Sequence, residues 1–516
     1  MNPEQVNYHY CDDLTTTPLP PGTRVLVTGA SGYVARRLIP ELAFRGYQVR
    51  CMFRSRRAPS HLTHPRIESV FADSLNRDEL RAALQGIEVA YYLIHSMRLK
   101  TSRFSEMDNV AAKNFAELAK EAGVRKIIYL GGLGETHPDL SPHLRSRQEV
   151  GHILAAAGVP VIRLRAAIII GAGSASYELL KSMILNNRWI PFLREFNSRC
   201  QPIAIRDVVK YLVGAMEVED LAGGGYPIGG KDVFTYKNLI LRFAKILGKP
   251  VRLFIVSWIP CPVGTCCKVY AHWLHFFISV PVNIISLLLA GLRNDVVCED
   301  DAIKKYLPFE PLGFDEAVQR ALEKENKFQV YSRWSDVPPE GMTDLMLLCE
   351  HESADFLIDE HSIEIPATPD KIFPSICRIG GKNGWFKGTS LWRIRGFIDR
   401  LFGGIGIQRG RRDPHHLRIG DSVDFWRVEK LEPNKELLLR GELIAPGLAW
   451  LQFELHPVSC RVTRLTIKAH FIPTPFLGYI YWFFLAKFHA YIFKNMQAHF
   501  YEEAVTANAC EEPVLK

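Results

Sequence analysis

The sequence has no arrangement of cysteines that would form a disulfide framework or a zinc site. Its eleven cysteines are an odd number, no CxxC pair occurs, and the cluster at Cys261, Cys266 and Cys267 has no His or Cys partners at zinc-ligand spacing. We therefore expect reduced thiols in a cytoplasmic protein. The first residues lack a basic stretch followed by an apolar one, so we expect no signal peptide.

A large excess of charge of either sign is also missing. Lys and Arg number 63 against 55 Asp and Glu, a formal net charge of +8 over 516 residues. This mild excess permits an anionic cofactor or an acidic membrane surface but does not indicate a nucleic-acid partner. Hydrophobic residues make up 47% of the chain, which excludes a disordered protein and provides for a substantial core.

From Thr23 onwards, short apolar runs alternate with helical periods, after a polar segment at 1–22 that we expect to be a flexible tail. The pattern predicts strands at 25–27, 48–53, 67–71, 88–94, 126–130 and 161–170, and helices after the first strand and at 104–121 and 144–157. Such alternation is typical of an α/β fold with a doubly wound parallel sheet. We place this domain at 23–335.

The later part of that domain, about 170–300, is irregular and apolar. Residues 269–292 contain no Asp, Glu, Lys or Arg, and a membrane span needs about 20 apolar residues. His272, His275 and Pro281 interrupt the stretch. Buried or substrate-facing helices are the favoured interpretation, with peripheral membrane contact and a true span as alternatives.

A different pattern follows the polar linker predicted at 336–344. Strands are expected near 361–366, 421–430, 436–444, 449–457 and 462–471, helices near 369–377 and 388–402, and a long closing helix at 476–504. One strand, two helices, several antiparallel strands and a final helix indicate an α+β domain, which we place at 345–510.

Aromatic residues occupy nearly every side of the closing helix, 476–499 in particular. Its uncharged run, Phe471–Ala486, has 16 residues and is shorter than the ~20 that a span requires. A helix packed across a curved sheet is favoured, and a helix lying in a membrane interface is the alternative.

The clearest motif lies between the first strand and its helix. A glycine there allows a tight turn, a second lets backbone N–H groups approach a pyrophosphate, and a third small residue, Ala35, permits close helix–sheet packing. The alternative is a glycine-rich turn without a ligand. The residues assigned to the cofactor by this motif are Gly29, Ala30, Ser31, Gly32, Tyr33 and Val34.

The G-x-x-G-x-x-A spacing resembles that of the short-chain dehydrogenase/reductase superfamily, in its extended or atypical branch. Further stretches are similar to bacterial atypical reductases that carry a C-terminal domain of unknown function: VAYYLIHSM, YLGGLGE, LSPHLRSRQEVGHIL and QPIAIRDVV. GRRDPHHLRIGDSVDFWRVE and PTPFLGYIYWFFLAKFHAYIF resemble the appended domain, which implies a START-like, helix-grip fold. The resemblance covers nearly the whole chain from residue 23.

Cofactor choice is indicated at the end of the second strand. An acidic residue there would bind the ribose of NAD, whereas Arg54 accommodates the 2′-phosphate of NADP, so we expect NADPH to be preferred over NADH. A solvated basic loop is the alternative. The remaining residues assigned to the cofactor are Ser55 and Arg56 beside Arg54, and Ile94, His95 and Ser96 near the nicotinamide. The resemblance implies that Asp73, with Ser74 beside it, meets the adenine. A packed loop histidine is an equal alternative for His95.

The usual Tyr-x-x-x-Lys catalytic pair of the superfamily is replaced here by His143 and Arg147. Histidine can act as a general acid and Arg147 can bind ribose hydroxyls, which favours an NADPH-dependent oxidoreductase acting on a hydrophobic carbonyl or enone. The alternative is an NADP(H)-binding redox sensor or a membrane-associated assembly factor without turnover. A second Tyr-x-x-x-Lys, at Tyr177 and Lys181, is interpreted as coincidence.

No metal site is expected, since Asp413, His415 and His416 surround a proline and indicate a turn. The partners predicted are a hydrophobic or lipid-like small molecule and no nucleic acid. The expected location is the cytoplasm, with peripheral contact to an inner membrane as an open alternative.

Overall fold

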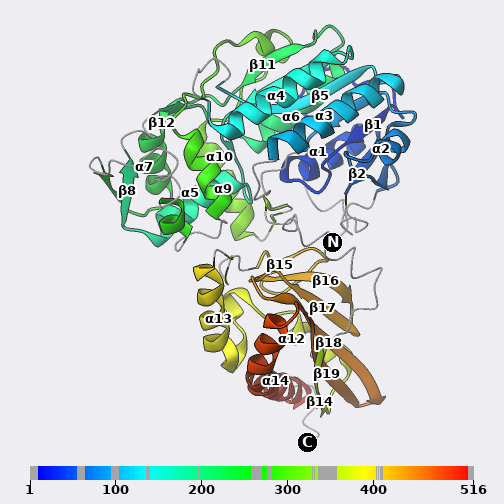
Figure 1. Ribbon diagram of the computed structural model, residues 1–516, viewed down its shortest axis with the longest axis vertical. Helices are drawn as coiled ribbons and strands as arrows, with labels where there is room; N and C mark the ends of the chain where they lie inside the picture. Colours follow the sequence, from blue (N-terminus) through cyan, green and yellow to red (C-terminus); the bar gives the residue numbers. More distant parts are fainter. Residues whose placement is uncertain are drawn as a thin grey trace, which may run out of the picture. The chain divides into compact units, whose positions relative to one another are not determined.

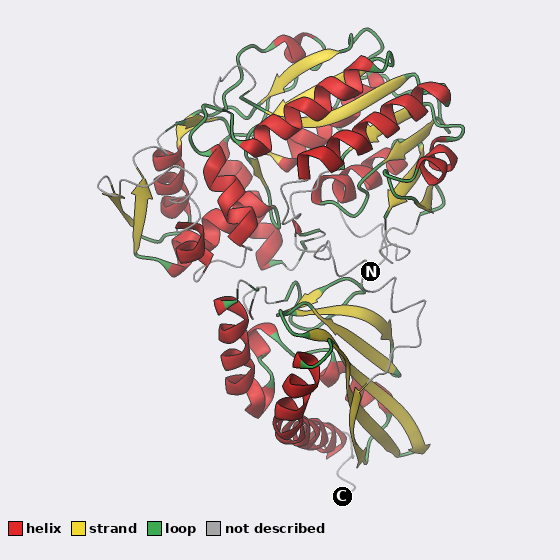
Figure 2. Cartoon of the chain, in the orientation of Figure 1, coloured by secondary structure: helices red, strands yellow, loops and turns green. Residues whose placement is uncertain are grey.

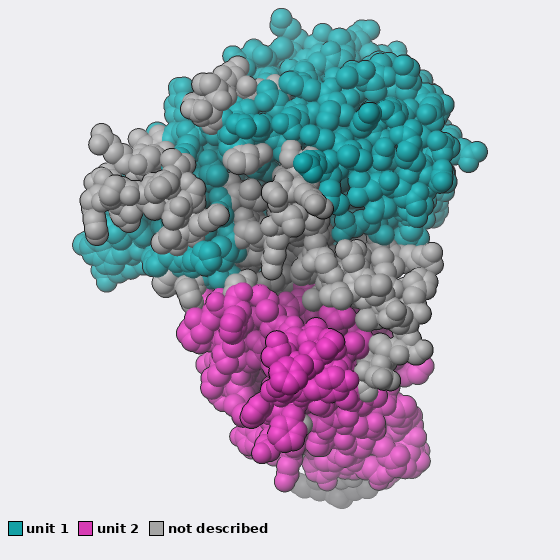
Figure 3. Space-filling view, viewed as in Figure 1, with its two compact units in different colours: residues 1–340 teal, residues 341–516 magenta. Residues whose placement is uncertain are grey.

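The computed structural model (Figure 1) describes residues 10–54, 64–94, 104–134, 140–193, 198–256, 270–275, 282–327, 329–330, 332–334, 357–402, 404, 406 and 411–509. Helices and strands alternate through the first part of the chain, whereas strands follow one another in the last (Figure 2). The chain divides into two compact units, residues 1–340 and 341–516 (Figure 3). The predicted linker 336–344 lies outside the described residues.

Unit 1 is built on a seven-stranded parallel sheet in the order β11-β6-β5-β4-β1-β2-β3. The strand order reverses between β1 and β4, as in a doubly wound fold. The strands are β1 (Arg24–Val27), β2 (Gln48–Phe53), β3 (Ile67–Phe71), β4 (Val89–Tyr92), β5 (Lys126–Gly132), β6 (Val161–Ala166) and β11 (Gly224–Ile228). The predicted α/β sheet is confirmed.

Helices cover both faces of this sheet (Figure 1). Side chains of β1 alternate between the two cores: Val25 and Val27 pack with α1 and α6, and Leu26 packs with α2, α3 and α4. The helices are α1 (Tyr33–Phe44), α2 (Arg77–Leu84), α3 (Phe104–Glu121), α4 (Pro142–Ala156) and α6 (Ile205–Glu217).

The rest of unit 1 forms a separate apolar core around four helices, α5 (Ala175–Asn186), α7 (Tyr236–Ile246), α9 (Val282–Gly291) and α10 (Phe314–Asn326). Three strand pairs border it: β7 (Ile169–Ile170) with β10 (Ile203–Ala204), β8 (Trp189–Leu193) with β13 (Arg252–Val256), and β9 (Arg199–Cys200) with β12 (Phe234–Thr235). The described parts of 269–292 bury Ala271, Leu274, Ile285 and Leu289 in this core. Across the described residues, no helix combines the length and apolar character needed to cross a bilayer.

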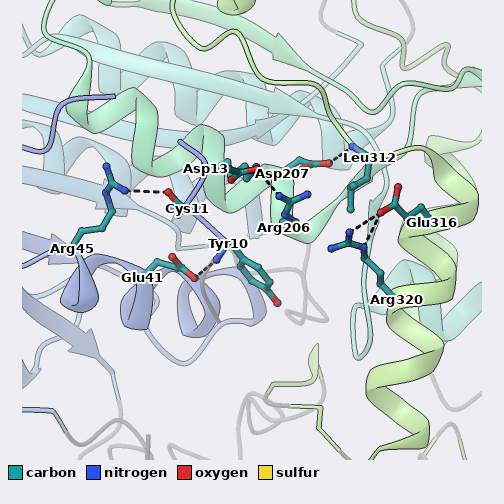
Figure 4. A network of polar contacts seen from close by, with 11 residues as sticks. Tyr10, Cys11, Asp13, Glu41, Arg45, Arg206, Asp207, Leu312, Glu316 and Arg320 are labelled. Carbon is teal, nitrogen blue, oxygen red and sulfur yellow. Dashed lines mark hydrogen bonds and ion pairs between the residues drawn. The ribbon is translucent and has the colours of Figure 1, made fainter. Parts of the chain in front are cut away.

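Residues 10–22 are not a flexible tail, which corrects the prediction. Tyr10, Cys11 and Leu14 are buried in the core that contains α1 and α6. The Tyr10 N–H donates to Glu41 of α1 at 2.8 Å, and Asp13 forms ion pairs with α6 (Figure 4). The sequence pattern missed this packing because every partner is distant in the chain.

Glu217, at the end of α6, links residues 10–22 to the end of α1 through hydrogen bonds. Its fully buried carboxylate accepts two hydrogen bonds from Arg45, at 2.6 and 2.7 Å, and one from the Tyr47 hydroxyl at 2.6 Å. The Thr16 hydroxyl donates to it as well. A buried carboxylate is stable here because Arg45 compensates its charge and its oxygens are hydrogen-bonded.

Unit 2 is an antiparallel sheet in the order β14-β19-β18-β17-β16-β15. Its strands are β14 (Leu357–Ile365), β15 (Ser422–Val423), β16 (Trp426–Glu432), β17 (Glu436–Gly441), β18 (Gly447–Ser459) and β19 (Val462–Pro473). Its helices are α12 (Pro369–Ile376), α13 (Thr389–Leu401) and α14 (Leu477–Ala509). α12 and the second half of α14 share a core with the sheet, in which Phe453, Ile467, Phe493 and Phe500 are buried.

The predicted strand at 421–430 is divided at Asp424, where the backbone φ is 55°. Its carboxylate accepts hydrogen bonds from the Trp385 indole at 2.7 Å and from the Gly381 N–H at 3.1 Å. These two hydrogen bonds stabilise the backbone at Asp424, where β15 and β16 are separated. Burial raises the pKa of Asp424 above its usual range, in spite of both donors.

Glu217→Gln should lower the free energy of unfolding by about 3 kcal/mol, because it leaves the guanidinium of Arg45 without its carboxylate. Urea denaturation at neutral pH measures this change. Glu316→Gln is the matched control, since Glu316 and Arg320 are paired on the surface at 50% and 53% exposure and should contribute less than about 1 kcal/mol. Equal losses in the two variants would contradict the prediction.

Candidate functional site

The turn after β1 lies tightly against the end of β4. Thr28 is fully buried, and its hydroxyl donates to the Tyr91 carbonyl at 3.0 Å and accepts from the Leu93 N–H at 3.1 Å. Gly29 follows with a φ of 61°, and a Cβ at this position would lie 2.7 Å from the Leu93 carbonyl oxygen. Glycine is therefore required here for both its backbone conformation and its lack of a side chain.

Helix α1 starts directly after this turn and presents its N-terminus to the edge of the sheet. The Gly32 N–H donates to the Gly29 carbonyl at 2.8 Å, and the first helical hydrogen bond runs from Arg36 to Gly32 at 3.0 Å. In this fully described helix, no side chain caps Gly32 and the first turn has no acidic residue. The N–H groups of Tyr33 and Val34 thus lie at the positive end of the helix dipole, which favours a phosphate.

The side chain of Tyr33 is held by contacts within unit 1. Its hydroxyl donates to the Ala172 carbonyl at 3.2 Å, and the Arg37 guanidinium lies 4.6 Å from the centre of its ring. Arg37 is itself buried and donates to the Ala172 and Ser332 carbonyls, at 2.7 and 3.4 Å. Sequence reasoning missed Arg37, which anchors α1 to two distant segments of unit 1.

The residues assigned to the adenine half lie at the ends of β2 and β3. These strands are paired in parallel with Phe53 opposite Phe71, and the Ala72 N–H donates to the Phe53 carbonyl at 2.9 Å, so Arg54 and Asp73 follow neighbouring strand ends. Arg54 is exposed and thus accessible to a phosphate. One carboxylate oxygen of Asp73 accepts from the Leu75 N–H at 2.9 Å, and the Ser74 carbonyl accepts from Asn114.

The nicotinamide half is described only in part. Ile94 follows β4, and its N atom would lie 3.3 Å from a Cβ on Gly29, so the structure brings Ile94 and the phosphate turn together. Ser55, Arg56, His95 and Ser96 lie outside the described residues.

His143 and Arg147 share one face of α4, four residues apart, as the sequence predicts. Burial, with a smaller effect from the charge of Arg147, lowers the pKa of His143 to about 3. His143 also lies in the first turn of α4, whose dipole disfavours a cation. The imidazole is consequently neutral at physiological pH, so it can donate or accept a hydrogen bond but holds no extra proton to give.

Glycines replace the serine that normally ends strand five in the superfamily. A Cβ on Gly132 would lie 2.9 Å from the side chain of Leu144 in α4, and one on Gly131 would lie 3.2 Å from the ring of Tyr129. The Tyr129 hydroxyl donates to the Arg147 carbonyl at 2.9 Å. α4 therefore packs closely on β5, and this packing leaves little room for a serine side chain at Gly132, near the end of the strand.

The second Tyr-x-x-x-Lys is part of the packing between α5 and α10. The Tyr177 hydroxyl donates to Glu325 at 3.1 Å, and Lys181 pairs with the same carboxylate. Burial raises the pKa of Tyr177 above its usual range, with Glu325 as a further cause. These contacts support the interpretation of the motif as a structural coincidence.

In unit 2, Asp413 stabilises the turn that contains the two histidines. Its Oδ1 atom accepts from the backbone N–H groups of His415 and His416, at 2.8 and 3.0 Å. Throughout the residues that the structure describes, no three His, Cys, Asp or Glu side chains converge on a possible metal position.

The turn at Gly29–Gly32 lies within a part of the chain that matches known proteins. Residues 29–167 match a family model described as NAD(P)H-binding. This part of the chain is an NAD(P)-binding Rossmann domain. It is similar to proteins of the atypical short-chain dehydrogenase/reductase kind, and its relatives are NAD(P)-dependent oxidoreductase-like proteins. The Gly29 turn and the uncapped α1 fit the pyrophosphate of such a cofactor. Arg54 and Asp73, which the sequence assigns to its adenosine half, follow the ends of the neighbouring strands β2 and β3.

Two relatives illustrate the range of proteins that share the Rossmann domain. A mitochondrial NADH dehydrogenase [ubiquinone] 1 alpha subcomplex subunit 9 of Arabidopsis thaliana is 25% identical over 267 residues, 47% of this chain and 66% of the relative. A ceramide reductase of Caulobacter vibrioides is 26% identical over 240 residues, 44% of this chain and 72% of the relative. The chain thus spans about two thirds of the length of these relatives.

Among solved structures, the triphenylmethane reductase of Citrobacter sp. complexed with NADP(H) is 17% identical, with a TM-score of 0.47, and the match covers 58% of this chain and 99% of that one. Residues 353–496 of unit 2 match a family model described as a protein of unknown function, DUF2867.

The depressed pKa of His143 predicts an effect on acid stability. An unfolded imidazole takes up a proton as the pH falls through about 6.5, whereas the folded His143 does so only near pH 3, so stability is lost between these values. His143→Gln should therefore flatten the decline in the free energy of unfolding, by up to about 1.4 kcal/mol per pH unit. Urea denaturation at several pH values measures the slopes, with replacement of the exposed His152 of α4 as control. Unchanged slopes in the His143 variant would refute this assignment.

Proposed function

We propose that this protein is a cytoplasmic, NADPH-dependent reductase of a hydrophobic carbonyl or enone. The observation that carries the proposal is the uncapped N-terminus of α1, which follows Gly29 at the point where the strand order reverses. Ligands of open α/β sheets bind in the crevice beyond such a reversal. The Arg54 guanidinium, exposed beside the Asp73 turn, supports a preference for the 2′-phosphate of NADPH.

An apolar substrate is supported by the second core of unit 1. That core follows the Rossmann strands in sequence and contains four helices with buried aromatic and aliphatic residues, among them Phe192, Phe243 and Phe314. The helical segment at 270–275 adds Tyr270 and Trp273, whose rings are stacked 5.7 Å apart. The relative named as a ceramide reductase acts on a lipid, which agrees with a lipid-like substrate here.

His143 and Arg147 are the side chains that we propose at the reaction site. The cofactor, when bound, supplies a hydride to the substrate carbon. A neutral His143 can donate a hydrogen bond to the substrate oxygen, where negative charge develops, while water provides the proton. Arg147 can bind the hydroxyl groups of the nicotinamide ribose.

The alternative is an NADP(H)-binding sensor or an assembly factor without turnover, with contact to a membrane. Two features favour it: the Tyr/Lys pair is replaced, and burial lowers the pKa of His143 to about 3, so the imidazole is neutral at physiological pH and is not a cationic acid. The relative named as a subunit of an NADH dehydrogenase belongs to a larger assembly.

For unit 2 we propose a START-like, helix-grip fold that shelters an apolar ligand. Its antiparallel sheet and its long C-terminal helix α14, packed on one face through Phe493, Met496 and Phe500, support this assignment.

Turnover distinguishes the two proposals. Full-length protein loaded with NADPH should oxidise it when long-chain aldehydes, ketones or enones are supplied, as followed by absorbance. His143→Phe should lower kcat about a hundredfold, since a hydrogen bond to developing charge is worth roughly 10²–10³ in rate, while the Kd for NADPH stays unchanged. Tight NADPH binding without consumption across the substrate panel would favour the sensor.

Cofactor preference provides a separate test. A charge-assisted contact to phosphate contributes roughly 1.5–3 kcal/mol, so the wild type should bind NADPH about tenfold to a hundredfold more tightly than NADH. Arg54→Asp should remove or reverse this difference, because it replaces the phosphate partner with a carboxylate that suits a free ribose hydroxyl. Calorimetry with both nucleotides gives the ratio. Equal affinities in the wild type would refute the role of Arg54.

A further inference from the structure

The first half of α14 exposes large aromatic side chains instead of burying them. Phe476, just before the helix, is 75% exposed, and Phe483, Phe484 and Phe488 are 68%, 64% and 50% exposed. The second half of the same helix behaves differently, since Phe493 and Phe500 are buried against the sheet. The exposed positions there include Glu502 and Thr506, and the exposed apolar side chains, Tyr501 and Val505, reach only 39% and 38%. The most exposed rings are therefore concentrated at one end of the helix.

Helix α13 adds a second row of exposed apolar side chains. Ile394, Phe397 and Leu401 are 58%, 54% and 57% exposed, and Phe402 after the helix is 73% exposed. We call the exposed sides of 394–402 and 476–491 the apolar helix face. Monomeric soluble proteins rarely expose so many large apolar side chains on neighbouring elements, and such surfaces mark interaction sites.

Polar contacts hold the two helices of the apolar helix face together. Arg395 of α13 donates to the Tyr481 hydroxyl of α14 at 3.1 Å and to the Ile444 carbonyl at 2.8 Å. Asp399 of α13 accepts from the Ile444 N–H at 2.6 Å. Ile444 is 44% exposed itself, so the loop before β18 continues the apolar surface between the helices.

The charged residues of α13 and of the first half of α14 are almost all basic. Apart from Asp399, all charged side chains of 389–402 and 474–494 are basic: Arg393, Arg395, Arg400, Lys487 and Lys494. Asp399 is fully buried and accepts backbone hydrogen bonds, so it adds no negative charge to the surface. Arg393, Lys487 and Lys494 are exposed. The apolar helix face thus combines exposed apolar side chains with exposed basic ones.

We infer that the apolar helix face docks on an anionic lipid surface, with α13 and the first half of α14 lying in the plane of the membrane. Phenylalanine rings can enter the boundary between headgroups and acyl chains, while Tyr479 and Tyr491 suit the headgroup level. Lys and Arg beside such a surface each contribute attraction to acidic lipids. The helix does not span the membrane in this arrangement. Its uncharged stretch, Phe471–Ala486, ends at Lys487 and has 16 residues, fewer than the ~20 that a span requires.

A second copy of the chain fits this face less well than a lipid surface does. A symmetric dimer would place the same face on both sides of the interface, so the exposed basic side chains of one copy would face a surface whose exposed charges are also basic. Like charges across an interface oppose association, whereas anionic headgroups neutralise them. This inference does not depend on the reaction in unit 1, because every residue that carries it lies in unit 2.

Sedimentation with vesicles tests the inference on the full-length protein. The wild type should bind vesicles made of equal parts phosphatidylcholine and phosphatidylglycerol, bind pure phosphatidylcholine more weakly, and lose affinity at high salt. Replacing Phe483, Phe484 and Phe488 together by Ser should weaken binding about tenfold or more. Each replacement removes the favourable free energy of transferring a phenyl ring from water into the membrane. Lys487→Glu combined with Lys494→Glu should lower affinity for the anionic vesicles only.

The matched control replaces apolar residues that are equally exposed elsewhere in unit 2. Ile358 of β14 and Val458 of β18 are 54% and 50% exposed, and their replacement by Ser should leave vesicle binding unchanged. Hydrogen exchange should show protection by vesicles at 389–402 and 474–494 but not at 357–365.

Three results would overturn the inference. The first is a wild type that stays in solution with every vesicle composition. The second is an equal loss of binding in the Ile358/Val458 control. The third is a wild type that forms a dimer in gel filtration and does not bind vesicles, while the triple Phe variant is a monomer. The apolar helix face would then be an interface between two copies.

Discussion

The contact between Gly29 and the Leu93 carbonyl determines where unit 1 can hold a dinucleotide. A Cβ at Gly29 would lie 2.7 Å from that oxygen, so only glycine allows β1 to turn into α1 beside β4. Thr28 adds hydrogen bonds to both Tyr91 and Leu93, which hold the two strand ends together. Because β1 and β4 are the strands between which the order reverses, this one close approach sets the position of the crevice, the α1 N-terminus and the residues that follow β2 and β3.

The fold was predictable wherever a local pattern carries the information. The Rossmann strands are short apolar runs, and Gly29 and Gly32 place the phosphate turn between β1 and α1, so periodicity and motif agree. The pattern missed α2, whose signal is a cap: Asn76 accepts from the N–H groups of Asp78 and Glu79. A short helix with a capping residue and few apolar positions has little periodicity to detect.

Features that depend on distant partners could not be read from the sequence. Residues 10–22 have the composition of a polar tail, and only the folded chain brings Asp13 to Lys210 and Thr16 to Glu217. His143 is a similar case: its position matches the motif, but its neutral state results from burial in the folded unit. The same holds for Arg37, since a basic residue on α1 gives no sign that it will be buried.

The contacts of Arg37 have a consequence for biosynthesis. This residue is made early, after Tyr10, whose hydroxyl is one of its hydrogen-bond acceptors, but long before its other two acceptors, the carbonyls of Ala172 and Ser332. During translation, α1 can pack on β1 and β2 long before residue 332 leaves the ribosome, so the guanidinium gains its two backbone acceptors later than that packing. Contacts across such sequence separations slow folding. The full set of hydrogen bonds that anchors α1 therefore forms only after residue 332 has been synthesised.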